Sequence, residues 1–301
     1  MIVSNDLSFR RIWPQASRRL LVLLIFDCAV AGLYSVTHSK LLTLDGLPIA
    51  PLGSALTIFL AFRTNAAYGR WWEARQLWGA LVNTSRSLAR QFLTLIDNDG
   101  GQDGLELKQQ LVRYQISFAH ALRCHLRKQN PFPELSSSLS PEQIEELRTS
   151  SNIPAAINLK MGELLQLTRE RGLIDSIRSV AIDENLTQLS NIQGACERIK
   201  NTPLPRQFAY LPRILVNVFC YLVPLGLVAN LGLMTPIVSV LISFSFIAAD
   251  LVGSDIENPF ENTIHDTPMT ALTRTIEINL REHMKDPKPL RGILSADGFV
   301  Y

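Results

Sequence analysis

The sequence predicts an all-helical membrane protein, with four transmembrane helices and a helical domain on one side of the bilayer. Apolar residues make up 47% of the 301 residues and charged residues 19%. The apolar residues are concentrated in four blocks instead of being spread evenly, as they are in a soluble domain. The long segment between the second and third blocks shows a helical period and no strand alternation. A large soluble protein with buried core helices is the alternative, because the second block is short for a membrane span.

The composition argues against several other classes. A formal net charge of +2, without a clustered basic face, predicts no nucleic-acid partner. The four cysteines form no C-x-x-C pair, so we expect free thiols and neither a disulfide framework nor a zinc site. Arginines precede the first apolar block, as in a signal peptide, but no clear cleavage site of small residues follows it. We therefore expect an uncleaved span.

The first apolar block is a better candidate for a membrane span than the second. Residues 20–36 are near the lower limit of the length that a bilayer requires and contain one acid, Asp27. Residues 47–62 are fewer and include Pro48 and Pro51 near their start, where a missing N–H is tolerated because helix-start donors have no intrahelical partner. Alone, this second block is the weakest of the four predicted spans.

The third and fourth blocks, residues 214–233 and 234–252, follow each other almost without polar residues. Such a run is too long for one span, so it must double back in a tight hairpin. Asn230, Gly232 and Pro236 are the residues that can break the helix there. The absence of charge from this hairpin favours membrane insertion over a soluble core.

The arginines flanking the blocks predict the orientation, because cytoplasmic loops near span ends carry an excess of basic residues. Only Lys40 lies in the loop that would face the other side. Both termini are therefore expected in the cytoplasm, in a multi-pass protein of the plasma membrane or bacterial inner membrane. The predicted segments are a cytoplasmic amino-terminal segment 1–19, two spans within 20–62, a cytoplasmic helical domain 63–213, two spans within 214–252 and a cytoplasmic carboxy-terminal segment 253–301.

Apolar periodicity predicts the helices of the polar segment. They are expected at 63–96, 106–127, 141–148, 154–171 and 173–200. The glycine-rich stretch 97–104 (DNDGGQDG) is predicted to be a turn between the first two. It is not expected to bind calcium, because an EF-hand loop requires an acid or amide at its fifth position, glycine at its sixth and glutamate at its twelfth, and this stretch has Gly101, Gln102 and Lys108.

No residue set predicts catalysis. The sequence contains no nucleophile elbow, phosphate-binding loop, zinc-protease motif or dinucleotide fingerprint, so neither an enzyme nor a cofactor is expected. His120 and Cys124 are spaced to share one helix face, with His125 beside them, and could hold a metal. Packing against neighbouring helices is the favoured interpretation of these three residues, and no metal site is predicted.

Four ordered motifs resemble the hallmarks of the bestrophin family, and most of all its bacterial branch. The longest is FRTNAAYGRWWEARQLWG at residues 62–79, which is followed by NTSR at 83–86. The others are QGACER at 193–198 with TPLP at 202–205, MTPIVSVLISF at 234–244, and IENPF at 256–260 with Asp266. The resemblance extends over nearly the whole chain.

The resemblance implies a homopentamer whose central pore is lined by the second span, with an apolar neck in the membrane and a second constriction at the cytoplasmic end. Carried over residue by residue, the neck falls on Ser54, Ile58 and Phe62. The cytoplasmic aperture falls on Ile177, with Ile174 one turn earlier as the alternative. The spacing of the neck residues also places them on one helical stripe. Five copies of Ile58 and Phe62 would form an apolar constriction that gates by losing its water.

The function implied is a channel for small monovalent ions. Eukaryotic members of the family pass chloride and other anions, whereas bacterial relatives prefer cations; an anion such as chloride is favoured here. Other copies of the chain, membrane lipid and the permeant ions are the expected partners. Calcium control is not expected, because few carboxylates occur at 261–266, where the family carries an acid-rich run. Asp266 is instead expected to cap the helix that starts at Met269.

Two other classes stay open. A membrane carrier would show internal repeats and polar groups near the bilayer midplane. No repeat is visible, and Asp27, the one acid well inside the first three blocks, is expected to pair with a neighbouring span. A membrane-anchored scaffold with a cytoplasmic partner is the third possibility, although no recognised output domain supports it.

Overall fold

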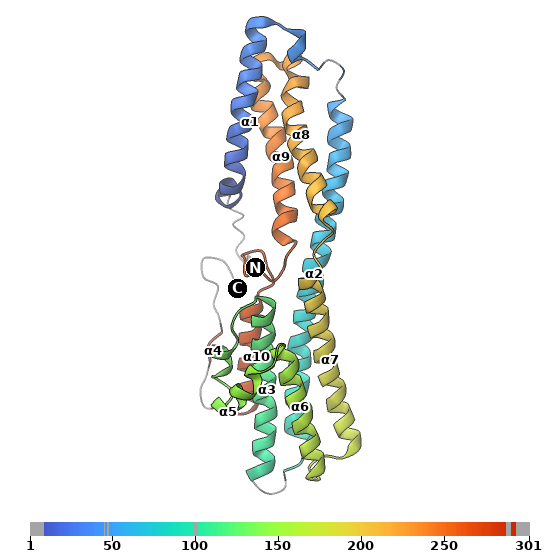
Figure 1. The fold of residues 1–301 in the computed structure, drawn as a ribbon, viewed down its shortest axis with the longest axis vertical. Coiled ribbons are helices and arrows are strands. Elements are labelled where there is room, and N and C mark those ends of the chain that lie inside the picture. Colours follow the sequence, from blue (N-terminus) through green and yellow to red (C-terminus); the bar gives the residue numbers. More distant parts are fainter. Residues whose placement is uncertain (1–8, 45, 47, 99–101, 287–289, 293–301) are drawn as a thin grey trace. The chain divides into compact units, whose positions relative to one another are not determined.

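The computed structural model describes residues 9–44, 46, 48–98, 102–286 and 290–292, and the regular structure among them is helical (Figure 1). These residues form two compact units. We call the first the apolar unit, which comprises the described residues among 4–71 and 203–258. The second, the polar unit, comprises the described residues among 72–202 and 259–301.

The helices of the apolar unit contain all four predicted blocks. They are α1 (Phe9–Thr37), the short 3-10 turn η1 (Lys40–Leu42), the first part of α2 (Ile49–Leu95), α8 (Arg206–Leu231), the 3-10 turn η2 (Gly232–Met234) and α9 (Thr235–Ile256). Helix α1 packs against both α8 and α9, which also pack on each other (Figure 1). It begins well before the predicted block 20–36 and accommodates Pro14 within its length.

The hairpin between α8 and α9 turns where the sequence predicts a break. Gly232 directly follows α8 and has a φ of 52°, a left-handed value that favours glycine. Pro236 lies in the first turn of α9, where the absence of its N–H costs little. Asn230 is part of α8 and does not contribute to the break. Glycine and proline therefore make this turn without the asparagine.

Helix α2 joins the core of the apolar unit through one stripe of its surface. Leu56 and Leu60 are buried there with side chains of α8 and α9. A Cβ atom at Gly53 would lie 3.3 Å from the ring of Phe219, so glycine allows a close approach of this ring. That ring in turn meets Phe246 edge to face, with centroids 4.9 Å apart. The aromatic pair fills the space beside the first turns of α2.

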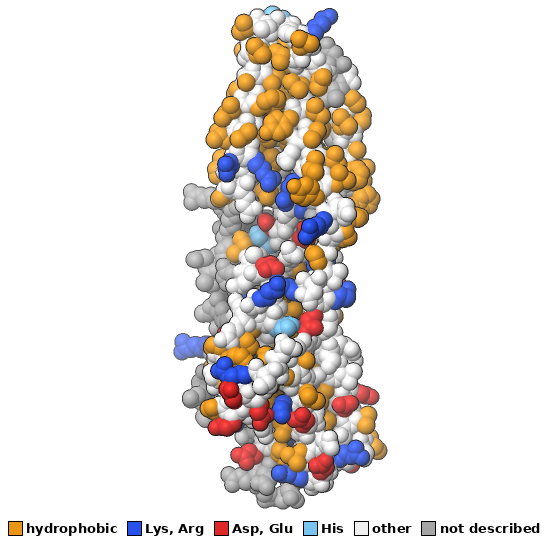
Figure 2. All heavy atoms as spheres, in the orientation of Figure 1, with side chains coloured by type: hydrophobic (Ala, Val, Ile, Leu, Met, Phe, Trp, Pro, Cys, Tyr) orange, Lys and Arg blue, Asp and Glu red, His pale blue; other side chains and the backbone are white. Residues whose placement is uncertain are grey.

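Much of the apolar unit's surface is hydrophobic. Figure 2 shows hydrophobic side chains gathered over this unit. The exposed ones on α1 and α9 include Leu21, Val22, Ile25, Leu33, Ile237 and Leu241. Among the described residues, the stretches Trp13–Thr37 and Arg206–Ile256 are long and apolar enough to cross a membrane. Helix α2 does not meet this measure, in agreement with the weakness of the second block.

The polar unit is built from the remaining helices. They are the second part of α2, α3 (Gln102–Leu126), α4 (Phe132–Leu135), α5 (Pro141–Arg148), α6 (Ile153–Glu170), α7 (Ser176–Asn201) and α10 (Met269–His283). Helix α5 has the predicted bounds and begins with a capping box at Ser140. The sequence analysis missed α4, which is only four residues long. Part of the predicted turn at 97–104, residues 99–101, lies outside the described residues, and Gly104 belongs to α3.

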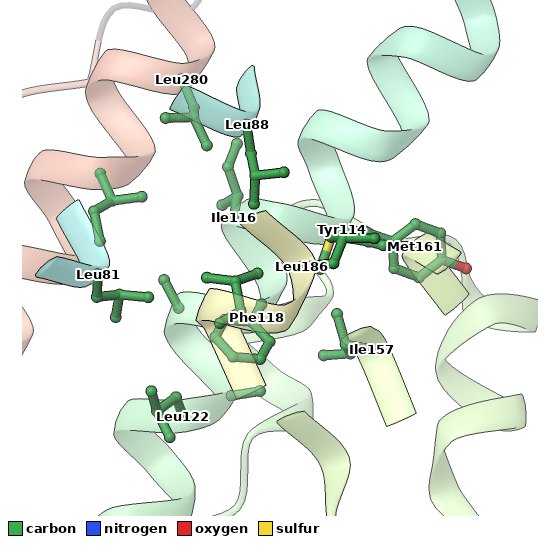
Figure 3. Close-up of a cluster of buried hydrophobic side chains, with 14 of the residues drawn as sticks. Leu81, Leu88, Tyr114, Ile116, Phe118, Leu122, Ile157, Met161, Leu186 and Leu280 are labelled. Carbon is green, nitrogen blue, oxygen red and sulfur yellow. The ribbon is translucent and has the colours of Figure 1, made fainter. Parts of the chain in front are cut away.

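A hydrophobic core holds the polar unit together, and Figure 3 shows part of it. Leu81 and Leu88 enter it from α2, Phe118 from α3 and Ile157 from α6. All four side chains are completely buried. Burying a side chain of this size contributes about 1.5 to 3 kcal/mol, so such clusters dominate the stability of the unit.

The boundaries of the two units follow packing, whereas the predicted segments follow hydropathy. The units divide between Trp71 and Trp72 and again between Thr202 and Pro203. Arg63 and Arg213, the first and last residues of the predicted domain 63–213, fall in the apolar unit, where both lie close to Asp250 of α9. The boundaries of the predicted segments concern where the chain leaves the membrane, and the packing units do not test them.

Asp266 does not cap α10, contrary to the prediction. Pro268 occupies the position before the helix and makes no side-chain cap. The Asp266 carboxylate instead accepts hydrogen bonds from the backbone N–H and the hydroxyl of Thr263, at 3.1 and 2.5 Å. It closes its own turn because Thr263 lies three residues before it, a spacing that suits such local bonds.

A buried ionic cluster joins α10 to α3. Glu277 of α10 accepts a hydrogen bond from Arg281 at 3.0 Å and from Arg274 at 2.8 Å, and His120 Nε2 of α3 lies 3.3 Å from the same carboxylate. Burial alone would raise the pKa of this carboxyl group. The contacts with His120 and Arg281 outweigh it and lower the pKa of Glu277 from 4.5 to about 2.

The Glu277→Gln variant is expected to be less stable than the wild-type protein at neutral pH, by about 3 kcal/mol. A depressed carboxyl pKa stabilises the folded state above the unfolded value, and this contribution disappears as the pH falls through the folded value. The difference between variant and wild type should therefore shrink from about pH 4.5 to about pH 2. Thermal denaturation at several pH values measures it. Glu282→Gln, on an exposed position of the same helix, is the control, and an equal loss in both variants contradicts the assignment.

Candidate functional site

The predicted neck residues lie on an exposed stripe of α2. The side chains of Ile58 and Phe62 are 56% and 62% exposed, and Ser54 is also exposed. A helix turns by about 100° per residue, so these three positions fall within about 80° of one another. Large apolar side chains that remain this exposed within one protomer require either lipid or another protein surface as their environment.

The opposite side of α2 is buried. Leu56, Leu60, Arg63 and Ala67 are all buried, and they lie about 180° to 240° around the helix from Ser54. Leu56 and Leu60 belong to one cluster with side chains of α8 and α9, and Arg63 binds Asp250 of α9. The core of the apolar unit thus fixes the rotation of α2, and this rotation turns the neck stripe away from the other helices of the unit.

Ser54, the polar member of the stripe, satisfies its own donor. Its hydroxyl donates to the carbonyl oxygen of Ala50 at 2.9 Å, one turn earlier in the helix. The oxygen lone pairs of Ser54 remain available on the exposed side. This position is therefore wettable, whereas Ile58 and Phe62 are not.

A buried ion pair anchors α2 to α9, and sequence reasoning missed it. Arg63 is 2% exposed and binds the Asp250 carboxylate of α9, which is 1% exposed. The same guanidinium donates to Ser254 Oγ at 2.7 Å and lies 3.6 Å from Glu257 Oε2. The available signal was Arg63 directly after the second block, together with Asp250 near the end of the fourth.

Two more arginines complete this network. Arg213 of α8 donates to Ser254 Oγ at 3.0 Å and lies 3.5 Å from Asp250 Oδ2. Arg70 donates to the backbone carbonyl of Glu257 at 3.1 Å. The Asp250 carboxylate is thus shared between arginines of α2 and α8, and the Glu257 carboxylate lies near Arg63, which balances charges that would be costly to bury alone. The network ties the candidate neck helix to both neighbouring helices.

The predicted cytoplasmic aperture falls on an exposed side chain of the polar unit. Ile177, in the first turn of α7, is 85% exposed. Ile174, the alternative, is 4% exposed and is part of the hydrophobic core. Helix α7 starts at Ser176 instead of the predicted 173 because the Asp175 side chain caps it, accepting from the backbone N–H of Arg178 at 2.8 Å.

The residues considered for a metal do not converge. His120 contacts Glu134 and Glu277, whereas His125 lies 3.3 Å from Glu197. Cys124 is buried and accepts a weak contact from Arg123 at 3.7 Å. In the described part of the chain, no group of three or more His, Cys, Asp or Glu side chains could hold a metal ion. The four cysteines are free thiols, as expected.

Asp27 faces the neighbouring helix α9, as predicted, but it forms no ion pair there among the described residues. The side chain is completely buried between α1 and α9, and Ser239 is the polar group that faces it. Neither carboxyl oxygen has a hydrogen-bond partner among the described residues. Arg63, the buried arginine of this unit, is bound to Asp250 instead.

Comparisons with known proteins identify the family. A family model for bacterial and fungal bestrophin proteins matches residues 8–282. The voltage-dependent anion channel-forming protein YneE of Salmonella typhimurium is 38% identical over 243 residues, which are 81% of this chain and 78% of the relative. A voltage-dependent anion channel-forming protein of Ralstonia nicotianae is 36% identical over 279 residues, covering 92% of this chain and 89% of the relative.

A solved structure agrees with these relatives. The crystal structure of a bacterial bestrophin homologue from Klebsiella pneumoniae matches with a TM-score of 0.83 and 32% identity, covering 89% of this chain and 97% of the other. Together with the apolar helices, these matches define a helical membrane protein. The chain belongs to the bestrophin family, in its bacterial branch.

Proposed function

We propose that this protein is a homopentameric ion channel whose pore neck is formed by Ser54, Ile58 and Phe62 of α2. The observation that carries the proposal is the division of α2 into a buried stripe and an exposed apolar stripe on opposite sides. Five copies arranged around an axis would bring the exposed stripes together. The relatives named as channel-forming proteins support the same function and give no reason to expect an enzyme.

The proposed topology has four transmembrane helices with both termini in the cytoplasm. Helices α1, α8 and α9 supply three of the spans, and the first part of α2 supplies the fourth. Its low hydropathy suits a helix that borders a pore and neighbouring subunits instead of lipid on all sides. The polar unit forms the cytoplasmic domain, in which Ile177 borders the second constriction.

The permeant ion is proposed to be a small anion such as chloride. The relatives' names favour an anion. The proposed neck itself carries no charge, so its apolar rings control water and access more than the sign of the ion. Selectivity then depends on the size and polarity of the path as a whole.

Recording single channels of the purified protein in planar bilayers with asymmetric potassium chloride tests this function. A reversal potential with the sign of the chloride equilibrium potential is expected. The opposite sign overturns the choice of anion while leaving a channel. A monomer by native mass spectrometry, together with no current at any voltage, overturns the channel and favours a membrane-anchored scaffold.

The Ile177→Ala variant is expected to change conductance or ion selectivity without lowering the stability of the protein. Its side chain is almost fully exposed in the protomer, so the fold does not depend on it. Ile174→Ala removes a core side chain instead and is expected to cost about 2 to 5 kcal/mol of unfolding free energy. Paired recordings and thermal denaturation separate the two effects. Wild-type conductance and selectivity in Ile177→Ala would remove this residue from the aperture.

A further inference from the structure

The polar unit contains a cavity of about 650 Å³ beside the buried ionic cluster of α3 and α10. This volume is in the range of pockets that hold small molecules. Helices α3, α4 and α10 contribute its lining, including His120, Arg123, Glu134, Arg274, Glu277 and Arg281. The lining therefore carries three guanidinium groups and two carboxylates.

The two carboxylates of the cavity are already occupied. Glu134 accepts from Arg123 Nη2 at 2.7 Å. Glu277 accepts from Arg274 and Arg281 and contacts His120, as described above. The pairing is reinforced at the edge, where Arg281 also binds Asp286 at 2.9 Å. A cation entering the cavity would find few carboxylate lone pairs that are not already used.

Two buried guanidinium N–H donors near the cavity, in contrast, have no acceptor among the described residues. Arg123 is 7% exposed, and its Nε atom is buried without a hydrogen-bond partner among the described residues. Arg127, directly after the end of α3, has a second such Nε atom, although its Nη1 donates to Thr270 at the cavity wall. A buried donor without an acceptor is costly, by about 1 to 3 kcal/mol for a neutral group and more for a charged one. These two donors therefore have no acceptor within the described residues.

The charges near the end of α3 also favour a bound anion. Burial, together with the charge of Arg123, lowers the pKa of Arg127 from 12.5 to about 10. The nearest opposing acid, Asp266, counteracts this only in part and is bonded to Thr263. The guanidinium groups of Arg123 and Arg127 thus repel each other behind the cavity wall, and a bound anion would relieve this repulsion.

We propose that this cavity binds a small metabolite through an oxyanion group, a phosphate or a carboxylate, held by Arg123 and Arg274. Oxyanions match the planar guanidinium fork, which can donate two parallel hydrogen bonds to one such group. Ser136 and Ser137 line the same cavity and add hydroxyl groups near its wall. The site is in the polar unit and does not depend on the assignment of the neck.

Binding to the full-length protein in detergent tests the proposal, with inorganic phosphate and succinate as probes against sodium chloride of equal ionic strength. Isothermal titration calorimetry and thermal denaturation should both show a saturable effect, since a ligand that binds the folded state raises its stability. Saturation by phosphate alone assigns a phosphate-bearing ligand, by succinate alone a carboxylate-bearing one, and by both a general oxyanion site. No saturable effect beyond that of chloride overturns the proposal.

Variants of Arg274 locate the site. Its side chain is about one-third exposed, so Arg274→Gln should fold, and it is expected to weaken binding about tenfold or more. Arg274→Lys keeps the charge but lacks the fork, and should weaken binding less. Arg171→Gln removes an exposed arginine elsewhere in the polar unit and should bind like the wild type. Equal binding by Arg274→Gln and wild type overturns the proposal, even if a probe binds.

Discussion

The Arg63→Gln variant is expected to lose about 3 to 5 kcal/mol of unfolding free energy, which corresponds to a melting temperature lower by roughly 10 °C. Glutamine cannot balance the charge of Asp250, which is 1% exposed and would remain buried with its strongest partner removed. Arg213 lies 3.5 Å from that carboxylate and is 40% exposed, so it compensates only in part. Thermal denaturation of the purified protein in detergent measures the loss.

Matched variants distinguish this ion pair from a general charge effect. Arg19→Gln removes an exposed arginine of the same unit and should leave the melting temperature within a few degrees of the wild type. Arg63→Met combined with Asp250→Leu should recover part of the loss, because replacing both members of a buried pair leaves no uncompensated charge. A single Arg63→Gln change that costs no more than Arg19→Gln would show that the pair is not what anchors α2.

Much of the fold could be predicted because it depends on local patterns. The four apolar blocks all fall within helices, and proline and glycine signals located the α8–α9 hairpin and the start of α5. The errors lie near helix starts, where a polar side chain forms a hydrogen bond with a group a few residues away. Asp175 starts α7 later than periodicity indicates, and Asp266 bonds Thr263 instead of capping α10. Several polar groups can compete for one cap, and sequence alone does not say which wins.

The anchoring of α2 could not be predicted, because it depends on two residues far apart in the chain. Arg63 and Asp250 are separated by 187 positions. Hydropathy treats the arginine as a marker of a span end, and only tertiary packing makes it a buried partner. The neck residues are a different case, because the family resemblance and the helical spacing of Ser54, Ile58 and Phe62 are visible in the sequence itself. Their role in permeation remains a prediction.

The Ile58→Ala and Phe62→Ala variants are expected to raise single-channel conductance several-fold. In a pentamer each substitution removes five apolar side chains from one ring, which widens the neck and lowers the tendency of its water to leave. The stability of the protomer should change little, because both side chains are more than half exposed and contribute little to the core. Single-channel recordings, combined with thermal denaturation of the same preparations, measure both properties.

Phe59→Ala is the matched control for these variants. Phe59 is also an exposed aromatic side chain of α2, at 47%, but it points about 100° away from Ile58 and about 60° away from Phe62 around the helix, outside the stripe of the three neck residues. Its truncation should leave conductance much closer to the wild type than that of Phe62. If Phe59→Ala raises conductance while Ile58→Ala and Phe62→Ala do not, then α2 is rotated differently about the pore axis. The buried stripe that contains Arg63 would then not be what orients the neck.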